Sequence, residues 1–277
     1  MNLAIDAGGT NLRAQIWHNN NFIAAAEAKS GGIGLYAWIE TLLTQYREIK
    51  TIGISFAGQV EGGKIISAPN ILIDEHNIKE RIESKYRVTL KIENDLNCAI
   101  LAEAKEFGVK NICALYVGTG LGLGVVESGR VIRGFKNVAT EIGHIPYKKT
   151  PLRCGCSRDN CLELYASGSG IAKQIEHKKA LCGTTLKELE RAGEIEIVEM
   201  FQEALLVAAG TTLTLFNPQV LVLGGGIIEA NPYLEELILK NIKDYALSNS
   251  LDGVKICKSR LQNASLSGAL LLKDFDD

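Results

Sequence analysis

The chain has 277 residues, of which 46% are hydrophobic and 22% charged, a composition typical of a soluble globular protein with room for two domains. Its formal net charge is −2, and no cluster of five or more Lys or Arg occurs, so a nucleic-acid partner is not expected. No apolar run reaches membrane-spanning length and the first ten residues lack the pattern of a signal peptide, so we expect no membrane partner.

Short β-branched or apolar runs that end in glycine or Asx turns predict the strands of mixed α/β sheets. These runs are Leu3 to Ile5, Leu12 to Trp17, Thr51 to Phe56, Thr89 to Ile92, Ile112 to Val117, Gly122 to Val126 and Val220 to Leu223. Helical periodicity between them predicts helices at Tyr36 to Arg47, Leu96 to Phe107, Glu196 to Phe216, Tyr233 to Tyr245 and Ser265 to Lys273. The order of these elements predicts two α/β halves.

The boundary between the halves is expected near Gly108 to Asn111, where a glycine-terminated helix gives way to a new strand. A glycine turn follows the first strand of each half, which suggests a duplication. We therefore expect an N-terminal α/β domain at residues 1–108 and a C-terminal α/β domain at residues 109–264.

Each of these glycine turns lies between two strands, so it is expected at a hairpin tip, and the usual nucleotide motifs that open a helix are excluded. Exposed backbone N–H groups at such turns can bind phosphate oxygens. Asp6 can hold Mg²⁺ through water, because magnesium keeps much of its hydration shell. Either turn alone could be an ordinary hairpin turn. Two such turns, each after a strand, are less expected by chance and together favour binding of a triphosphate. The phosphate residues are expected to be Gly8, Gly9, Thr10, Gly118, Thr119 and Gly120.

Three glycines, Gly224, Gly225 and Gly226, follow an apolar strand and precede a helix that is expected to open at Asn231-Pro232. A plain strand-to-helix turn needs only one glycine, whereas three permit the close approach of a flat ring. Contact with a ligand and contact with another part of the fold are both open.

Asn94 and Asp95 lie between a predicted strand and a predicted helix. One of them could be the N-cap of that helix. The functional alternative is that Asp95 is a general base, which accepts the proton of a hydroxyl group during phosphoryl transfer. The positive end of the helix would lower the pKa of this carboxyl group.

Three cysteines at Cys-x-Cys-x4-Cys, together with His144, form the clearest metal motif of the chain: Cys154, Cys156 and Cys161. Three thiolates and one imidazole are the closed tetrahedral set of a structural zinc site. Three buried small residues and a satisfied histidine are a weaker alternative, because this segment is polar. Glu141 and Glu163 bracket the motif, so the metal would fix both carboxylates for binding hydroxyl groups.

The other four of the seven cysteines are scattered singly: Cys98, Cys113, Cys182 and Cys257. An odd number with one metal cluster suits a reducing compartment better than a disulfide framework. We therefore expect a cytoplasmic protein.

Taken together, five motifs resemble the ROK family of sugar kinases and repressors. They are Asp6 to Thr10, Glu93-Asn94-Asp95, Gly118 to Gly120, Glu141 to His144 with Cys154 to Glu163, and Gly224 to Gly226. The resemblance implies the actin-like, ribonuclease-H-like ATPase architecture, with two related α/β domains that close on a cleft. It also implies that the final helix, at about 265–277, returns to the first domain, and it suggests a homodimer.

The chain departs from the family at two places. Ser157 and Asn160 stand inside the zinc loop where the family usually has glycines. Ile71 to Glu75 follows Pro69-Asn70 where the family often has a segment that contains an aromatic residue. The residues that distinguish one sugar from another are expected partly in the stretch from Ile71 to Asn77.

The resemblance implies ATP-dependent transfer of the γ-phosphoryl group to the 6-hydroxyl of a hexose, with ATP, Mg²⁺ and structural Zn²⁺ bound. Glucose is the first choice, and N-acetylmannosamine, N-acetylglucosamine, fructose or mannose are the alternatives. Asp95 would be the base, and the sugar-binding residues would be Asn94, Asp95, Glu141, His144, Glu163, Gly58 and Asn70. Adenosine would lie near Gly224 to Gly226.

Two functions of other classes were weighed. A sugar-sensing repressor of this family would carry an N-terminal helix-turn-helix segment, and with only five residues before Asp6 we do not expect one. A non-catalytic sugar-binding or zinc-stabilised scaffold would not need Asp95 together with both phosphate turns.

Overall fold

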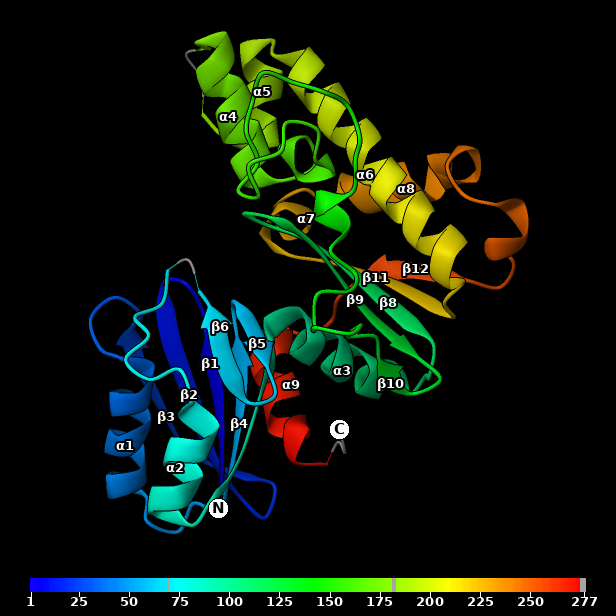
Figure 1. Cartoon of the computed structure of the whole chain (residues 1–277). Coiled ribbons are helices and arrows are strands. Elements are labelled where there is room, and N and C mark those ends of the chain that lie inside the picture. Colours follow the sequence, from blue (N-terminus) through cyan, green and yellow to red (C-terminus); the bar gives the residue numbers. More distant parts are fainter. Residues whose placement is uncertain (69, 181–182, 275–277) are drawn as a thin grey trace. The chain divides into compact units, whose positions relative to one another are not determined.

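The computed structural model describes residues 1–68, 70–180 and 183–274 of the chain. It divides into two compact units, which Figure 1 shows in the colours of the sequence. Unit 1 comprises residues 1–106, 133–139 and 261–277, and unit 2 comprises residues 107–132 and 140–260. Pro69, Cys182 and the last three residues of the predicted C-terminal segment lie outside the described residues.

Unit 1 is built on a five-stranded sheet in the order β3-β2-β1-β4-β7. Its strands are β1 (Asn2–Ala7), β2 (Asn11–His18), β3 (Asn21–Lys29), β4 (Thr51–Phe56) and β7 (Thr89–Asn94). The first strand pairs antiparallel with β2 and parallel with β4, and β4 pairs parallel with β7. A separate hairpin is formed by β5 (Gln59–Glu61) and β6 (Lys64–Ser67). The helices are α1 (Leu35–Gln45), α2 (Ile78–Tyr86), α3 (Asp95–Phe107), α9 (Ala264–Leu271) and the 3₁₀ turn η5 (Leu272–Asp274).

Unit 2 repeats this arrangement in a second five-stranded sheet, in the order β10-β9-β8-β11-β12. Its strands are β8 (Ile112–Val117), β9 (Leu121–Glu127), β10 (Arg130–Val131), β11 (Val220–Gly224) and β12 (Lys255–Lys258). Its helices are α4 (Gly168–Lys178), α5 (Leu186–Ala192), α6 (Ile195–Phe216), α7 (Gly226–Ala230) and α8 (Tyr233–Asn241). The 3₁₀ turns are η1 (Ile142–His144), η2 (Leu162–Leu164), η3 (Ile242–Asp244) and η4 (Ser248–Ser250).

Both sheets follow the same plan. In each, the first strand pairs antiparallel with the strand that follows it in the chain and parallel with the third strand after it. These pairs are β1 with β2 and β4 in unit 1, and β8 with β9 and β11 in unit 2. In both, a second parallel strand then completes the edge. This shared topology agrees with the duplication that the two glycine turns suggested.

The alternation of side chains along β1 and β4 separates two faces of the sheet in unit 1. Leu3, Ile5 and Ala7 lie in the main core cluster of the unit, with buried residues of α1 and α2. Ala4 points to the opposite face, where it packs with Leu266 and Ala269 of α9. Figure 1 shows α9 against β4, so the last described helix completes the core of the unit that the N-terminus begins.

Most predicted elements are present, with ends displaced by a few residues. The helix expected at Tyr233 to Tyr245 ends earlier, at Asn241, and continues as the 3₁₀ turn η3. The helix expected to open at Asn231-Pro232 is α8, whose N-cap residue is Pro232, and the short helix α7 between it and the turn at Gly224 to Gly226 was not predicted. The sequence analysis missed β3, β12, the β5–β6 hairpin and the helices α2, α4 and α5.

The predicted domain limits differ from the two units by a few residues at 107–108 and 261–264, and in one internal segment. Residues 133–139, which lie inside the predicted second domain, group with unit 1. The chain therefore crosses from unit 2 to unit 1 at residue 133 and returns at residue 140.

Close approach of α9 to β4 requires glycine at position 53. A Cβ atom on Gly53 would lie 1.9 Å from the carbonyl oxygen of Ala269, a backbone atom that cannot move aside. We expect Gly53→Ala to lower the free energy of unfolding by about 1–3 kcal/mol, because α9 must shift away from the sheet. The measurement is thermal unfolding followed by circular dichroism.

Gly31→Ala is the matched control, because a Cβ atom there meets nothing within 4 Å. A melting temperature for Gly53→Ala that equals the control's would contradict this account of the packing.

Candidate functional site

The predicted residues of unit 1 gather at one edge of its sheet. The strands β1, β4 and β7 are parallel, and Ala7, Phe56 and Asn94 form one row across them near their carboxyl ends. The loops that follow these strands begin at Gly8, at Ala57 and at the start of α3. Ligands of open α/β sheets bind at such carboxyl edges.

The turn after β1 is a tight hairpin, as predicted. The backbone N–H of Gly8 donates to the carbonyl of Asn11 at 3.1 Å, and the hydroxyl of Ser30 donates to the carbonyl of Gly8 at 2.5 Å. Gly9 and Thr10 at the tip are exposed. The backbone of the turn is therefore fixed while its tip stays accessible, a geometry suited to phosphate oxygens.

Asp6 lies on β1 beside Ser55 of β4, whose hydroxyl donates to its carboxylate at 3.3 Å. Burial raises the pKa of Asp6, and the hydrogen bond from Ser55 and the charge of Arg13 oppose this effect only in part. A bound cation would favour the ionised form, so the carboxyl group suits a position near Mg²⁺ and phosphate.

Asn94 is the N-cap residue of α3, the alternative that the sequence had left open. Its side-chain oxygen accepts from the backbone N–H of Leu96 at 3.0 Å and of Asn97 at 3.3 Å. Its side-chain nitrogen donates to the carbonyl of Gly58 at 3.2 Å. Both polar ends of Asn94 therefore have partners within unit 1, and Asp95 occupies the first position of the helix. The sugar-binding role of Asn94 stays a prediction.

Gly58 is fixed by packing as well as by this hydrogen bond. A Cβ atom there would lie 2.4 Å from the carbonyl oxygen of Ser67 and 2.6 Å from the ring of Phe56. Asn70, the other weaker sugar-binding candidate, is exposed, and its side chain lies beside Gly9.

The stretch from Ile71 to Glu75, which departs from the family pattern, is hydrogen-bonded to the start of α1. The carboxylate of Asp74 accepts from the backbone N–H groups of Tyr36 at 2.9 Å and Ala37 at 3.0 Å, at the start of α1. The backbone N–H of Leu72 donates to the carbonyl of Ser30, and the carbonyl of Leu72 accepts from the N–H of Leu35. The segment is therefore tied to the start of α1, and its part in choosing a sugar stays a prediction.

Unit 2 contains a cavity of about 520 Å³ beside its own glycine turn. Its lining comprises Gly118, Thr119, Gly168, Ser169, Ile171, Ala172, Thr184, Thr185, Leu186, Gly226, Ile227, Ala230 and Asn231. The predicted residues Gly118, Thr119 and Gly226 thus share one cavity. Apolar walls with a few convergent polar groups are typical of nucleotide and other small-molecule pockets.

The N-terminus of α4 holds the turn at Gly118 in place. The backbone N–H groups of Gly168 and Ser169 donate to the carbonyls of Gly118 at 2.8 Å and Thr119 at 3.0 Å. The hydroxyl of Ser167 caps the helix through the N–H of Gly170. Within the turn itself, the N–H of Gly118 donates to the carbonyl of Gly120 at 3.0 Å, which confirms the predicted hairpin.

The three consecutive glycines at 224–226 have different surroundings, so each position has its own relation to a side chain. Gly224 packs against the ring of Tyr116, which a Cβ atom would approach to 2.5 Å. Gly225 has a φ of +90° and lies against the backbone of Val117. A Cβ atom on Gly226 would meet nothing within 4 Å, and this residue lines the cavity. Two of the three glycines are thus required by packing of β11 on β8, and the nucleotide roles stay predictions.

Sequence analysis missed most residues of this cavity. Two local signals point to the helices that carry them. Ser167 before α4 is an N-cap, and Thr185 with Glu188 forms a capping box at the start of α5. Neither signal would have placed Ile227 or Asn231 in the same cavity, because that depends on how the helices pack.

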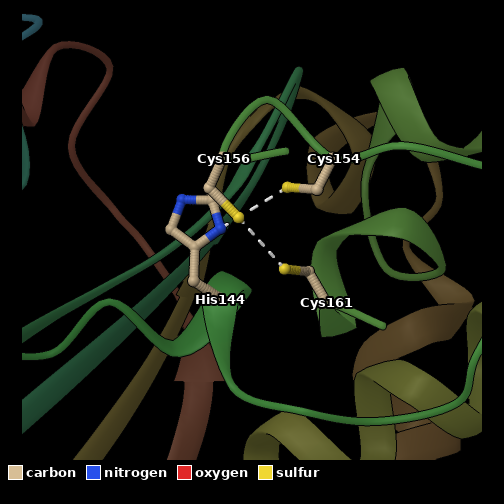
Figure 2. Close-up of side chains that lie close together, drawn as sticks. All are labelled: His144, Cys154, Cys156 and Cys161. Carbon is tan, nitrogen blue, oxygen red and sulfur yellow. Dashed lines mark hydrogen bonds between the residues drawn. The ribbon is translucent and has the colours of Figure 1, made fainter. Parts of the chain in front are cut away.

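The proposed metal ligands lie together. The ligand atoms of His144, Cys154, Cys156 and Cys161 are all within 4.8 Å of one another. Figure 2 shows the four side chains converging from η1 and the loop that follows it, with Nδ1 of His144 3.5 Å from Sγ of Cys154 and the sulfurs of Cys156 and Cys161 3.3 Å apart. In tetrahedral zinc sites the ligand sulfurs are about 3.8 Å apart, so this set fits a zinc ion.

Arg158 closes the loop over this cluster. Its guanidinium donates to the carbonyl of His144 and lies beside Cys156, where it lowers the pKa of the thiol to about 6. Ser157 has a φ of +71°, the conformation in which glycine is usual. Asn160 does not have a positive φ, so glycine is not required there. Only the first of the two departures in the loop therefore strains the backbone.

Glu163 connects the cluster to the glycine turn of unit 2. One oxygen accepts from the backbone N–H of Leu121 at 3.1 Å, at the start of β9, and the other lies 3.6 Å from Sγ of Cys154. Glu141 is largely exposed, and its carboxylate lies 4.0 Å from Nε2 of His144. Loss of hydration raises the pKa of Glu141, His144 lowers it and Glu163 raises it further. The imidazole thus faces the cysteines with one nitrogen and Glu141 with the other.

A model of the ROK family matches residues 2–274 of the chain. The chain belongs to the ROK family. Its fold is that of ROK kinases of known structure: it superposes on a ROK hexokinase from Thermus thermophilus with a TM-score of 0.81 at 25% identity, covering 99% of both chains. The predicted architecture of actin-like, ribonuclease-H-like α/β domains is confirmed.

Relatives within the family include both enzymes and regulators. An N-acetyl-D-glucosamine kinase of Vibrio cholerae is 29% identical over 86% of this chain and 88% of its own. A glucokinase of Halalkalibacterium halodurans is 30% identical over 82% of this chain and 77% of its own. A xylose repressor of Bacillus subtilis is 29% identical over 78% of this chain and 59% of its own.

Among the described residues, no helix combines the length and the apolar character that crossing a bilayer requires.

The buried carboxyl group of Asp6 predicts a pH-dependent effect on stability. The pKa of Asp6 in the folded protein is raised above the ordinary value of 3.8, so ionisation of this carboxyl group destabilises the fold at pH 7. This destabilisation disappears when the pH falls below 3.8, where Asp6 is protonated in both the folded and the unfolded chain. Without nucleotide or metal, Asp6→Asn is expected to raise the melting temperature at pH 7. The gain over wild type should shrink as the pH falls toward 4, and a gain that is absent at pH 7 would contradict the account.

The cysteine cluster predicts one structural metal ion per chain. Purified protein is expected to contain about one zinc ion per chain, measured by inductively coupled plasma mass spectrometry. Cys161→Ser should reduce the content at least tenfold and lower the melting temperature, because the loop loses a ligand. Cys257→Ser, outside the cluster, should retain the metal. Equal zinc content in the two variants would contradict the assignment.

Proposed function

We propose that this protein is an ATP-dependent hexose kinase, which transfers the γ-phosphoryl group of ATP to the 6-hydroxyl of its sugar. The proposal rests mainly on one observation: Asp95 lies at the carboxyl edge of the sheet in unit 1, in the same row of loops as Asp6 and the exposed tip at Gly9. A carboxylate and a phosphate-binding turn at one edge are the two parts that direct phosphoryl transfer to a hydroxyl group requires.

Asp95 is the proposed general base. A sugar hydroxyl is a weak nucleophile, and a carboxylate that orients it and accepts its proton as the phosphoryl group moves avoids a covalent intermediate. The N-terminus of α3 stabilises the ionised carboxylate, so Asp95 orients the hydroxyl first and takes the proton late. Mg²⁺, when bound with ATP, neutralises the phosphates, and Asp6 would hold it through water.

ATP is proposed to bind with its phosphates at the two glycine turns and its adenosine in the cavity of unit 2. This cavity supports the assignment because it places Gly118, Thr119 and Gly226 together and offers the apolar side chains Ile171 and Ile227 to a ring. Ser169 and Asn231 add polar groups that the sequence analysis had not identified.

The sugar is proposed to contact Asn94, Gly58 and Asn70 from unit 1, and Glu141, His144 and Glu163 from unit 2. Glucose is the proposed substrate, with N-acetylglucosamine, N-acetylmannosamine, mannose and fructose as alternatives. The two glutamates favour a polyhydroxylated ligand, since each carboxylate can accept hydrogen bonds from hydroxyl groups. A structural zinc ion would fix the orientation of His144 and, through the loop, the positions of both glutamates relative to one another.

A sugar-responsive regulator is the alternative that the relatives support, because the family includes repressors. A regulator needs to bind a sugar but needs neither a general base nor a phosphate turn. The presence of Asp95, Asp6 and the exposed Gly9 tip in one place therefore favours the enzyme.

The base assignment predicts a separation of catalysis from binding. Asp95→Asn should lower kcat by about 10²- to 10⁴-fold, because the amide cannot accept the proton, while sugar affinity measured by calorimetry changes little. The activity assay couples ADP release to NADH oxidation. Turnover of the variant near that of wild type would refute the role of Asp95.

The same assay with a panel of the five sugars tests the class of protein. We expect sugar-dependent release of ADP with at least one of them, and the highest kcat/KM identifies the substrate. Binding of a sugar without any turnover of ATP would favour the regulator, and absence of both would contradict the proposal as a whole.

A further inference from the structure

Glu93, the first residue of the Glu93-Asn94-Asp95 motif, is a buried carboxylate that accepts hydrogen bonds from four donors. It lies on β7 directly before Asn94 and is 6% exposed. One oxygen accepts from Nε of Arg133 at 2.5 Å. The other accepts from three donors: the backbone N–H of Asn94 at 2.8 Å, Nδ2 of Asn97 at 3.0 Å and Nδ2 of Asn137 at 2.9 Å.

These partners come from two places in the chain. Asn94 and Asn97 belong to the junction of β7 with α3, which carries Asp95. Arg133 and Asn137 belong to residues 133–139, the segment in which the chain crosses from unit 2 into unit 1 and back. Glu93 is therefore the group through which the crossing segment and the junction are joined.

Two residues of the crossing segment have a positive φ. Asn137 has a φ of +56° and Gly134 a φ of +71°, and one backbone hydrogen bond, from Ala139 to Arg133 at 3.1 Å, closes the loop. Asn137 makes two further contacts: its Nδ2 also donates to the carbonyl of Val60, and its Oδ1 accepts from Asn97. The amide of Asn137 is thus held in one orientation by Glu93, Asn97 and Val60 together.

The charge of Glu93 is maintained by these contacts. Burial alone raises the pKa of this carboxyl group, but the hydrogen bonds from Asn97, Arg133 and Asn137 outweigh it, and the net pKa lies below the ordinary value. Loss of the carboxylate would leave four buried donors without their acceptor, and protonation would set a hydroxyl hydrogen against at least one of these donors, so either change is unfavourable in a buried place. The network therefore has one stable arrangement, and in it the backbone around Asn94 is fixed.

We infer that Glu93 is a positioning residue for Asp95: it fixes the junction that carries the base and the crossing segment as one rigid piece. The inference rests on the proposed kinase function, because it assigns Asp95 as the base. Glu93 is proposed to act through Asn94, Asn97 and Asn137. A displacement of about 1 Å in a catalytic group can lower turnover by about 10²-fold, so fixing this junction has a large effect on catalysis.

The test compares Glu93→Gln with wild type at a temperature well below the melting temperature of either protein. The amide places a donor opposite Arg133, so the network must rearrange. We expect kcat to fall about 10- to 100-fold while KM for ATP stays within twofold, since the two glycine turns and the cavity proposed to bind ATP include none of the partners of Glu93. Glu61 and Glu93 both line a second cavity of about 410 Å³, in unit 1. Glu61→Gln is the matched control, because this carboxylate is exposed and the substitution should leave both values unchanged.

Asn137→Gly provides a second variant, which removes the donor, tolerates the positive φ and leaves the pair of Glu93 and Arg133 intact. It should lower kcat about 3- to 10-fold with the same unchanged KM for ATP. A kcat of Glu93→Gln within twofold of wild type would overturn the inference. So would a parallel loss of kcat and of ATP affinity, which indicates a general loosening of the fold.

Hydrogen exchange of the peptide that covers residues 133–139 gives a readout without catalysis. In Glu93→Gln this peptide is expected to exchange at least tenfold faster than in wild type, and unchanged exchange would overturn the inference. A wild-type protein without sugar-dependent turnover would instead refute the proposed function, while the exchange experiment would still report on the network.

Discussion

Parallel pairing of β1 with β4 and of β4 with β7 is the constraint on which the candidate site of unit 1 depends. Parallel strands end at the same edge, so the segments after residues 7, 56 and 94, which are far apart in sequence, are brought together by strand pairing. The hydrogen bond from Asn94 to the carbonyl of Gly58 then adds a specific contact between two of them. Unit 2 uses the same device: β8 and β11 are parallel, and the turns after them, at Gly118 and at Gly225, meet at one edge beside the cavity. The repeated topology thus explains why the chain carries two glycine turns rather than one.

The residues at these edges show where function and stability make different demands. Asp6 is buried enough for its pKa to be raised, which is unfavourable for the fold and useful only if a cation is bound nearby. Ser157 keeps a positive φ that glycine would adopt more easily, in the loop that brings the cysteines together. Glu93 is the opposite case, because its burial is fully compensated by four donors. A buried polar group that is completely satisfied defines one arrangement of the backbone around it.

The sequence predicted the parts of this protein that have a local cause. Seven of the strands, the two hairpin turns and the cysteine cluster follow from periodicity, glycine placement and ligand spacing, and the structure has each of them. Parts that depend on packing were not predictable in the same way. The cavity of unit 2 includes Ile227 and Asn231 because α7 lies beside the start of α4. The crossing segment at residues 133–139 groups with unit 1, where Arg133 and Asn137 bind Glu93. For the glycines at 224 and 225 the sequence left ligand contact and packing both open. The ring of Tyr116 and the backbone of Val117 supply the packing reason, which sequence spacing alone does not show.

The central claim is that a sugar hydroxyl, activated by Asp95, attacks the γ-phosphoryl group of ATP. Product analysis tests it most directly: wild-type protein is incubated with ATP, Mg²⁺ and glucose, and ³¹P NMR follows the fate of the γ-phosphorus. The account predicts a hexose 6-phosphate that accumulates in step with ADP. Release of the γ-phosphorus only as inorganic phosphate, or ATP that remains intact with every hexose tested, would contradict it.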